Sequence, residues 1–151
     1  MHSGSEAKGE KDVFQRLQSF WLGESSEPFS DRVLELAYEP VRVGGMVECD
    51  ARAVVLDGCG DAFEIFLKIN DGRVADATFL SDGCGAVMAC GSALCEWVVG
   101  KTVREAEGAT SEDVIRRLDG LPSSHRHCAD QAVQALHSAL ESVGRRSPGS
   151  P

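Results

Sequence analysis

The sequence contains no apolar run that approaches the roughly 20 residues needed by a membrane-spanning helix. It also has little positive charge: 15 Lys and Arg stand against 24 Asp and Glu, so the formal net charge at pH 7 is −9. Binding to a nucleic-acid backbone or to an anionic membrane surface depends on clustered Lys and Arg. The composition therefore predicts neither a nucleic-acid partner nor a membrane partner.

The N-terminal stretch MHSGSEAKGEKD lacks the apolar core of a secretory signal peptide and contains acidic residues. We therefore expect a cytoplasmic protein. In a reducing compartment, cysteines are expected as free thiols or metal ligands before disulfides. The six cysteines of this chain are interpreted in that way.

The length of 151 residues predicts one domain with tails. Residues 1–28 are expected to form an N-terminal extension that is partly disordered, because its first residues are polar and small. Within it, DVFQRLQSFWL places apolar side chains at helical spacing, which predicts a short amphipathic helix over residues 12–22. Residues 29–144 are expected to form the folded domain, and 145–151 a flexible tail.

The middle of the chain alternates apolar and polar residues as strands do, in ECDARAVVLD, AFEIFLKIN and RVADATFLS. Asn70-Asp71-Gly72 predicts a tight turn between the last two of these strands, and hence a hairpin. In the third strand, Ala75, Ala77 and Phe79 are expected on one face. These features favour an antiparallel sheet of three strands.

Helices are predicted in FSDRVLELAYEP, GAVMACGSALCEWVVG, SEDVIRRLDG and CADQAVQALHSALESVG. Ser30 is the expected N-cap of the first and Ser111 that of the third. Gly144 is the expected end of the last helix. Strands followed by helices predict an α+β sandwich, in which the three-stranded antiparallel sheet packs against the helices.

The stretch SDGCGAVMACGSALCEW holds Cys84, Cys90 and Cys95. On one helix, Cys84 and Cys95 would be separated by roughly 16 Å, and Cys90 and Cys95 would differ by about 140° around the axis. Two sulfur ligands of one zinc ion must lie within roughly 4 Å of each other. No pair of the three can therefore share a metal ion. Cys90 and Cys95, like Cys49, are expected to be core or helix-surface residues.

Three cysteines lie in unusual local sequence. Cys59 lies in the glycine-flanked DGCGDA, Cys84 in DGCGA before a helix, and Cys128 follows His127 at the start of the last helix. The N–H groups at a helix start favour thiolate, the form that binds metal or accepts sulfur. From spacing alone, a shared site and separate buried thiols remain equally open. Asp61 could equally be a turn residue, and His127 a helix residue without a chemical role.

The motifs Cys-Gly-Asp, Gly-Cys-Gly and His-Cys follow one another here at separations that resemble the IscU/NifU-type iron–sulfur cluster assembly scaffolds. The similar segments run from CGDAFEIFLKIN through GKTVREA and resume at LPSSHRHCADQAVQALHSAL, with FSDRVLELAYEP before them. The resemblance spans about Phe29 to Val143, most of the chain. It implies a small α+β sandwich with a three-stranded antiparallel sheet.

The resemblance also implies a site at one exposed end of the domain, with Cys59, Asp61, Cys84, His127 and Cys128 as ligand candidates. The implied cargo is a labile [2Fe-2S] cluster, and zinc is a possible occupant in the isolated protein. The implied partners are a cysteine desulfurase, which is a pyridoxal-phosphate enzyme, and recipient apo-iron–sulfur proteins. A protein of this kind is a carrier and not an enzyme.

Two other interpretations remain. A SufU-type zinc-dependent sulfur acceptor stimulates a cysteine desulfurase, but SufU-like chains carry a long insertion before the third site cysteine, where SEDVIRRLDG fills a short interval here. A structural or regulatory zinc module is the second. The chain also departs from the scaffold family: the usual chaperone-recognition stretch Leu-Pro-Pro-Val-Lys is LPSSH here, which makes an Hsp70-type chaperone a doubtful partner.

Overall fold

A three-stranded antiparallel sheet lies at the centre of the fold. The computed structural model describes residue 13 and residues 16–58 and 60–149, with only the backbone for 144–149. The strands are β1 (Ala51–Leu56), β2 (Ala62–Asn70) and β3 (Arg73–Ser81), in the order β1-β2-β3. Asp71 and Gly72, with φ of 52° and 73°, form the predicted turn between β2 and β3. The predicted α+β class with three antiparallel strands is confirmed.

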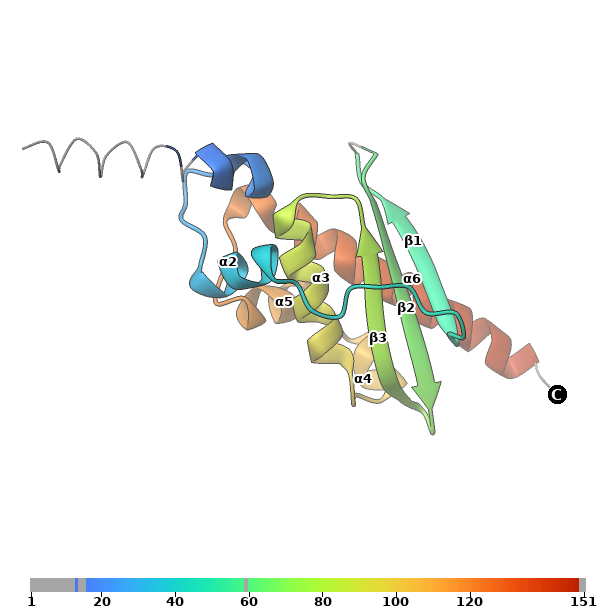
Figure 1. Cartoon of the computed structure of the whole chain (residues 1–151). Coiled ribbons are helices and arrows are strands. Elements are labelled where there is room, and N and C mark those ends of the chain that lie inside the picture. Colours follow the sequence, from blue (N-terminus) through green and yellow to red (C-terminus); the bar gives the residue numbers. More distant parts are fainter. Residues whose placement is uncertain (1–12, 14–15, 59, 150–151) are drawn as a thin grey trace, which may run out of the picture.

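Helices cover one face of this sheet. They are α2 (Asp31–Tyr38), α3 (Gly85–Val98), α4 (Val103–Glu107), α5 (Ser111–Arg117), the 3₁₀ turn η1 (Ser123–His125) and α6 (Arg126–Gly149), preceded by a helix over residues 16–22. Figure 1 shows α6 crossing behind the strands, while the chain between α2 and β1 crosses in front of them. In the described part of the chain, no helix combines the length and the apolar character that crossing a membrane requires.

The core lies between the sheet and the two helices α3 and α6. From the sheet, Phe63, Ile65 and Phe79 are fully buried. Gly91 of α3 faces Phe79, and a Cβ atom at this glycine would lie 2.5 Å from Cε2 of the ring. The absence of a side chain at Gly91 therefore lets α3 approach β3 closely.

The third strand departs from the predicted alternation. Val74, Ala77 and Phe79 are buried, whereas Ala75 is exposed. A register shift between Lys68 and Ile69 of β2 pairs these residues with positions 76 and 74 of β3, so that residue 75 is an extra residue on β3. A β-bulge of this kind reverses the alternation on one side of it, so the prediction for Ala75 is wrong.

The helix ends also differ in part from prediction. Ser30 is the N-cap of α2, as expected, but α5 is capped by Thr110 and not by Ser111. Thr110 and Asp113 form a capping box, in which each side chain accepts a hydrogen bond from the other's backbone N–H. The predicted end of the last helix at Gly144 is wrong, because α6 continues to Gly149. A glycine ends a helix by adopting positive φ, and at Gly144 the backbone stays helical.

Part of the predicted N-terminal helix lies outside the described residues, as do residues 1–12, for which disorder was expected in part. Residues 16–22 are helical. Leu17 and Phe20 of the predicted apolar face are 62% and 89% exposed, whereas Leu22 is fully buried. The helix therefore contacts the domain through its C-terminal end.

Candidate functional site

Two of the predicted site cysteines meet where two helices begin. Cys84 is the residue directly before α3, with extended backbone, and Cys128 lies in the first turn of α6. The two helices pack against each other, and Figure 1 shows that their first turns lie at the same end of the domain. This packing places the side chains of Cys84 and Cys128 close enough to share a hydrogen bond.

This hydrogen bond separates the acidities of the two thiols. It is the main reason why the pKa of Cys84 falls to about 5, against the opposing effect of partial burial. The N–H groups of Val87 and Ala86, in the first turn of α3, lower this pKa further, and nearby His125 contributes less. The same hydrogen bond, with burial, raises the pKa of Cys128 far above its usual range. The pair therefore favours the state in which Cys128 keeps its proton and Cys84 is the thiolate.

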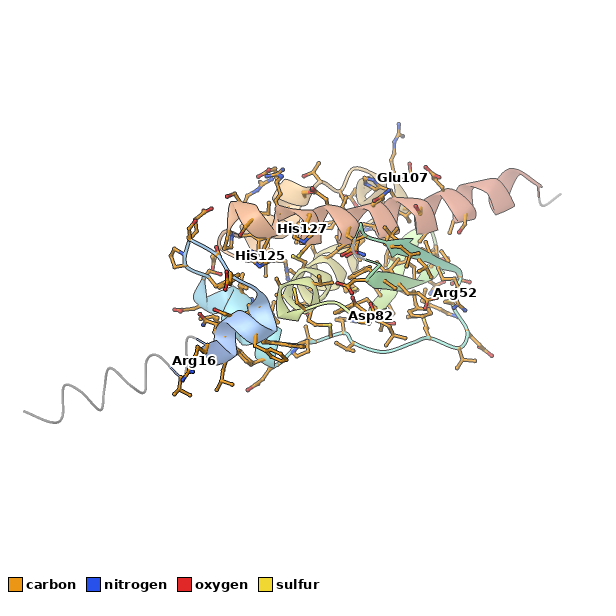
Figure 2. All side chains as sticks on the ribbon, turned by 90° about the horizontal axis from the view of Figure 1, so that it is seen from above. Arg16, Arg52, Asp82, Glu107, His125 and His127 are labelled. Atoms are coloured by element: carbon orange, nitrogen blue, oxygen red, sulfur yellow. The ribbon has the colours of Figure 1, made fainter. Side chains whose placement is uncertain are left out.

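Two histidines precede Cys128, His125 at the end of η1 and His127 in the first turn of α6, and their ring centroids lie 6.3 Å apart (Figure 2). His127 is exposed, and its Nε2 lies 3.6 Å from Sγ of Cys128. His125 is buried, and its Nε2 lies 2.6 Å from the carbonyl oxygen of Leu22. Because a carbonyl only accepts, Nε2 of His125 carries the proton, and Nδ1 can accept from the Ser124 hydroxyl at 2.8 Å. His127 is thus the histidine placed to bind a metal, and His125 holds the preceding segment.

The loop between β1 and β2 carries the other predicted ligands. Cys59 itself lies outside the described residues. Asp61 is half-buried, and its N–H donates to Oδ1 of Asp57 at 2.9 Å. Its carbonyl oxygen accepts from the N–H of Asp57, also at 2.9 Å. These two bonds join residues 57 and 61 and so close the loop on itself. Neither bond uses the Asp61 carboxylate.

Gln131 joins this loop to α6. Its Nε2 donates to the carbonyl oxygens of Val55 and Asp61, both at 3.1 Å. Gln131 lies three residues after Cys128, and residues three apart share one face of a helix. The sequence interpretation did not identify Gln131. The available signal was a glutamine beside Ala132 and Val133, in the buried stripe of the last helix.

The same loop is tied to the start of α3. The Asp82 carboxylate accepts from the N–H of Ala62 at 2.7 Å, and the Ser81 hydroxyl donates to the carbonyl oxygen of Ala62 at 2.7 Å. The N–H of Gly83, directly before Cys84, donates to the Ser81 oxygen at 3.0 Å. The Asp61 loop and the Cys84 turn therefore form one connected unit.

The N-terminal helix lies against the turn that carries Cys84. Trp21 donates through Nε1 to the carbonyl oxygen of Ala37 at 2.6 Å, and its indole covers Gly85. A Cβ atom at Gly85 would overlap the indole ring. Trp21 therefore covers part of the site, a role that its place on an amphipathic helix did not reveal.

The other cysteines among the described residues are not part of this site. Cys90 and Cys95 are fully buried in α3, and burial raises the pKa of both thiols well above the usual range. They are core residues, as predicted. Cys49 is half-buried and precedes β1.

The donors that the structure brings together are the sulfurs of Cys84 and Cys128 and the ring of His127. Within the described residues, which omit Cys59, no three His, Cys, Asp or Glu side chains are grouped so that they could hold a metal ion. Thiolate and imidazole are nevertheless the donor types that zinc and iron–sulfur clusters use. The arrangement supplies a preformed thiol–thiolate pair on two rigid helices, beside a loop that carries further donors in its sequence.

Comparison with known proteins identifies the family. The family described as NifU-like N terminal domain matches residues 28–148. The iron-sulfur cluster assembly scaffold protein IscU 1 of Archaeoglobus fulgidus is 34% identical over 120 residues, which cover 79% of this chain and 78% of that protein. Escherichia coli IscU is 32% identical over 117 residues, which cover 74% of this chain and 91% of that protein.

Solved structures share the fold. A NifU-like N-terminal protein from Brucella abortus gives a TM-score of 0.60 at 23% identity, over 77% of this chain and 94% of that one. A putative scaffold protein for the SUF system from Fervidobacterium islandicum gives 0.61 at 18% identity, over 74% and 96%. The sequence match over most of the chain and the shared fold lead to one conclusion: the chain belongs to the family of NifU-like N-terminal domains.

Proposed function

We propose that this protein is an iron–sulfur cluster assembly scaffold. It accepts sulfur from a cysteine desulfurase, takes up iron, assembles a labile [2Fe-2S] cluster on Cys59, Cys84 and Cys128, and passes the cluster to apo-proteins. The observation that carries the proposal is the meeting of Cys84 and Cys128 at the first turns of α3 and α6, a contact that lowers the pKa of Cys84. Family membership supports the same class of function.

The thiolate of Cys84 suits sulfur acceptance. A desulfurase persulfide carries the transferable sulfur on its outer atom. The Cys84 thiolate attacks that atom, a new sulfur–sulfur bond forms on Cys84, and the desulfurase cysteine leaves as a thiolate. This transfer is an exchange and needs no added oxidant or reductant. Conversion of the bound sulfur to the sulfide of a cluster then takes two electrons per sulfur, which ferrous iron and a thiol reductant supply. A group with its pKa near 5 is available for the transfer throughout the neutral range.

A mixed ligand set suits release of the cluster. Three thiolates with one harder ligand, either the Asp61 carboxylate or the His127 ring, hold a cluster less firmly than four thiolates do. His127 is exposed whereas Cys128 beside it is fully buried, so the histidine is the more open of these two ligands to solvent and to a recipient. This property fits a donor rather than an electron carrier.

The proposed partners are the desulfurase and the recipient apo-proteins. An Hsp70-type chaperone is left out, because the LPSSH segment departs from the family's usual stretch. Its side chains are also engaged within the chain: the Ser123 hydroxyl donates to the Glu27 carboxylate at 2.6 Å, and His125 donates to Leu22. We further propose that the protein is a cytoplasmic carrier without enzymatic turnover of its own.

Anaerobic reconstitution tests the proposal. The purified protein is mixed with ferrous iron, cysteine and a cysteine desulfurase, and visible absorption, iron and acid-labile sulfide are measured. We expect a coloured product with two iron and two sulfide per cluster, since a [2Fe-2S] cluster has that composition. Cys84→Ala should abolish it, whereas the matched variant Cys49→Ala should not. A colourless wild-type product that retains stoichiometric zinc would overturn the assignment.

A SufU-type zinc-dependent sulfur acceptor is the second candidate. The donor set favours it to some extent, because two thiols, a histidine and a carboxylate also suit one tetrahedral zinc ion. The short interval between Cys84 and Cys128 in the sequence argues against it. Zinc-loaded protein that stimulates a desulfurase without ever taking up iron would identify this function. A purely structural zinc module would leave the desulfurase rate unchanged.

A further inference from the structure

Gln131 holds both ends of the loop between β1 and β2. Its side chain is only 4% exposed and its Nε2 donates to Val55, near the end of β1, and to Asp61, directly before β2. The amide has two hydrogens, so it can make both bonds at once. The sequence places Cys59 between these two carbonyl groups.

The orientation of this amide follows from its partners. Both partners are backbone carbonyls, which only accept, so the nitrogen of Gln131 must face the loop. The oxygen, Oε1, is then buried, and among the described residues it finds no hydrogen-bond partner. A buried carbonyl without a partner is unfavourable, and an apolar side chain of similar size would avoid that penalty. The two bonds to the loop are therefore the reason for an amide at this position.

We propose that Gln131 is a positioning residue of the cluster site, which holds the loop of Asp61 against the helix that carries Cys128. That this site binds a cluster rests on the function proposed above. The two hydrogen bonds from Gln131 to the loop, which we call the clamp, do not depend on that function. Gln131 and Cys128 lie one turn apart on α6, so the clamp sets the distance between the loop and the Cys128 thiol.

Of the hydrogen bonds described above for residues 55–58 and 60–62, those from Gln131 are the ones that reach α6. The bonds between Asp57 and Asp61 close the loop internally, and Asp82 ties Ala62 to the turn before α3. The bonds from Gln131 run from the loop to α6. Without them, the loop loses this anchor to α6, so its internal hydrogen bonds open more often and it gains freedom relative to Cys128. A site whose ligands come from both elements then loses its defined geometry.

Hydrogen–deuterium exchange of the metal-free protein tests the clamp. The variants are Gln131→Met, which removes the donor at similar size, and Gln131→Glu, which keeps the shape but only accepts at neutral pH. The control is Gln134→Met, an exposed glutamine on the same helix. Loss of the two bonds should speed exchange of the Asp57, Gly60 and Asp61 amides about tenfold, and leave amides in the middle of β2 unchanged. Unchanged loop exchange in both Gln131 variants overturns the proposal.

A spectroscopic readout connects the clamp to the site. After reconstitution, visible circular dichroism reports the geometry around the cluster, and the rate at which a chelator bleaches the cluster reports how firmly the protein binds it. Both Gln131 variants should bind the wild-type amount of iron at first, show altered circular dichroism, and bleach several-fold faster than Gln134→Met. Wild-type circular dichroism and bleaching in these variants overturn the positioning role.

The two proposals fail in different ways. If the wild-type protein forms no cluster, the scaffold function falls, while faster loop exchange in the Gln131 variants still supports the clamp. If the wild-type protein forms a cluster but the loop amides of the Gln131 variants exchange at the wild-type rate, only the clamp proposal is overturned. Should Gln131→Met not fold, Gln131→Asn, which keeps the donor on a shorter arm, provides the same comparison.

Discussion

The side chains of Cys84 and Cys128 lie close enough to share a hydrogen bond, and this contact lowers the pKa of Cys84 while it raises that of Cys128. Cys128 comes from α6 and Cys84 from the start of α3, so the reactivity of Cys84 depends on the contact between two helices.

The first prediction concerns the pH dependence of Cys84. Because its pKa is lowered to about 5, alkylation of Cys84 by iodoacetamide should reach half its maximal rate near that pH and stay fast at neutral pH. Cys128→Ala removes the donor, so the pKa rises and Cys84 stays protonated to higher pH. At pH 6 its alkylation should slow about tenfold, as judged by mass spectrometry of the peptide that contains Cys84.

Cys128→Ser is the matched control for that experiment. A serine hydroxyl still donates to Cys84, so its alkylation profile should stay closer to wild type than that of Cys128→Ala. An unchanged profile in Cys128→Ala would show that the two sulfurs do not share a proton.

The second prediction concerns the Asp61 carboxylate. Asp61→Ala removes one candidate harder ligand but keeps the backbone bonds of residue 61 to Asp57 and Gln131, so the loop should persist. The reconstituted cluster should then survive longer against oxygen or a chelator, measured by the decay of visible absorption. Asp57→Ala, which removes the acceptor of the Asp61 N–H, serves as the control for loop damage. A cluster lifetime in Asp61→Ala equal to or below that of wild type would show that Asp61 does not promote release of the cluster.

The third prediction separates the buried cysteines from the site. Cys90→Ser and Cys95→Ser each place a hydroxyl at a fully buried apolar position. Each should lower the free energy of unfolding by about 1–3 kcal/mol, measured by denaturant titration. Iron and sulfide content after reconstitution should remain at the wild-type level. Loss of the cluster in either folded variant contradicts the assignment of both residues to the core.

The fourth prediction concerns the N-terminal helix. Trp21→Ala removes the indole that covers Gly85 and its bond to Ala37, and should lower the free energy of unfolding by about 2–4 kcal/mol. Phe20→Ala is the control, because Phe20 is 89% exposed and its removal should change stability by no more than about 0.5 kcal/mol. Equal effects of the two variants would show that the helix does not pack on the domain in solution.

A double-mutant cycle sharpens that test. Gly85→Ala adds a methyl group that overlaps the Trp21 ring and should destabilise the protein by about 1–3 kcal/mol. In the Trp21→Ala background the overlap is gone, so the same change should cost much less. Additive effects of the two substitutions contradict direct contact between residues 21 and 85.

Much of the fold is predictable because it depends on local patterns. The alternation in AFEIFLKIN, the Asn70-Asp71-Gly72 turn and the Ser30 cap each concern residues that are close in the chain. The bulge at Ala75 and the cap at Thr110 were missed for different reasons. The bulge depends on pairing with β2, and Thr110 and Ser111 are adjacent residues that both suit an N-cap. The five-residue helix α4 is too short to show a period.

The sequence by itself determined the class of the fold, the exclusion of Cys90 and Cys95 from a metal site shared with Cys84, and the helix starts at which Cys84 and Cys128 lie, because these follow from residue type and periodicity. Only the tertiary structure decided that the thiol of Cys128 reaches Cys84, that Trp21 covers Gly85, and that Gln131 holds both ends of the Asp61 loop. These contacts join residues that are far apart in the chain, and the packing of α3, α6 and the sheet brings them together. No local pattern contains that information.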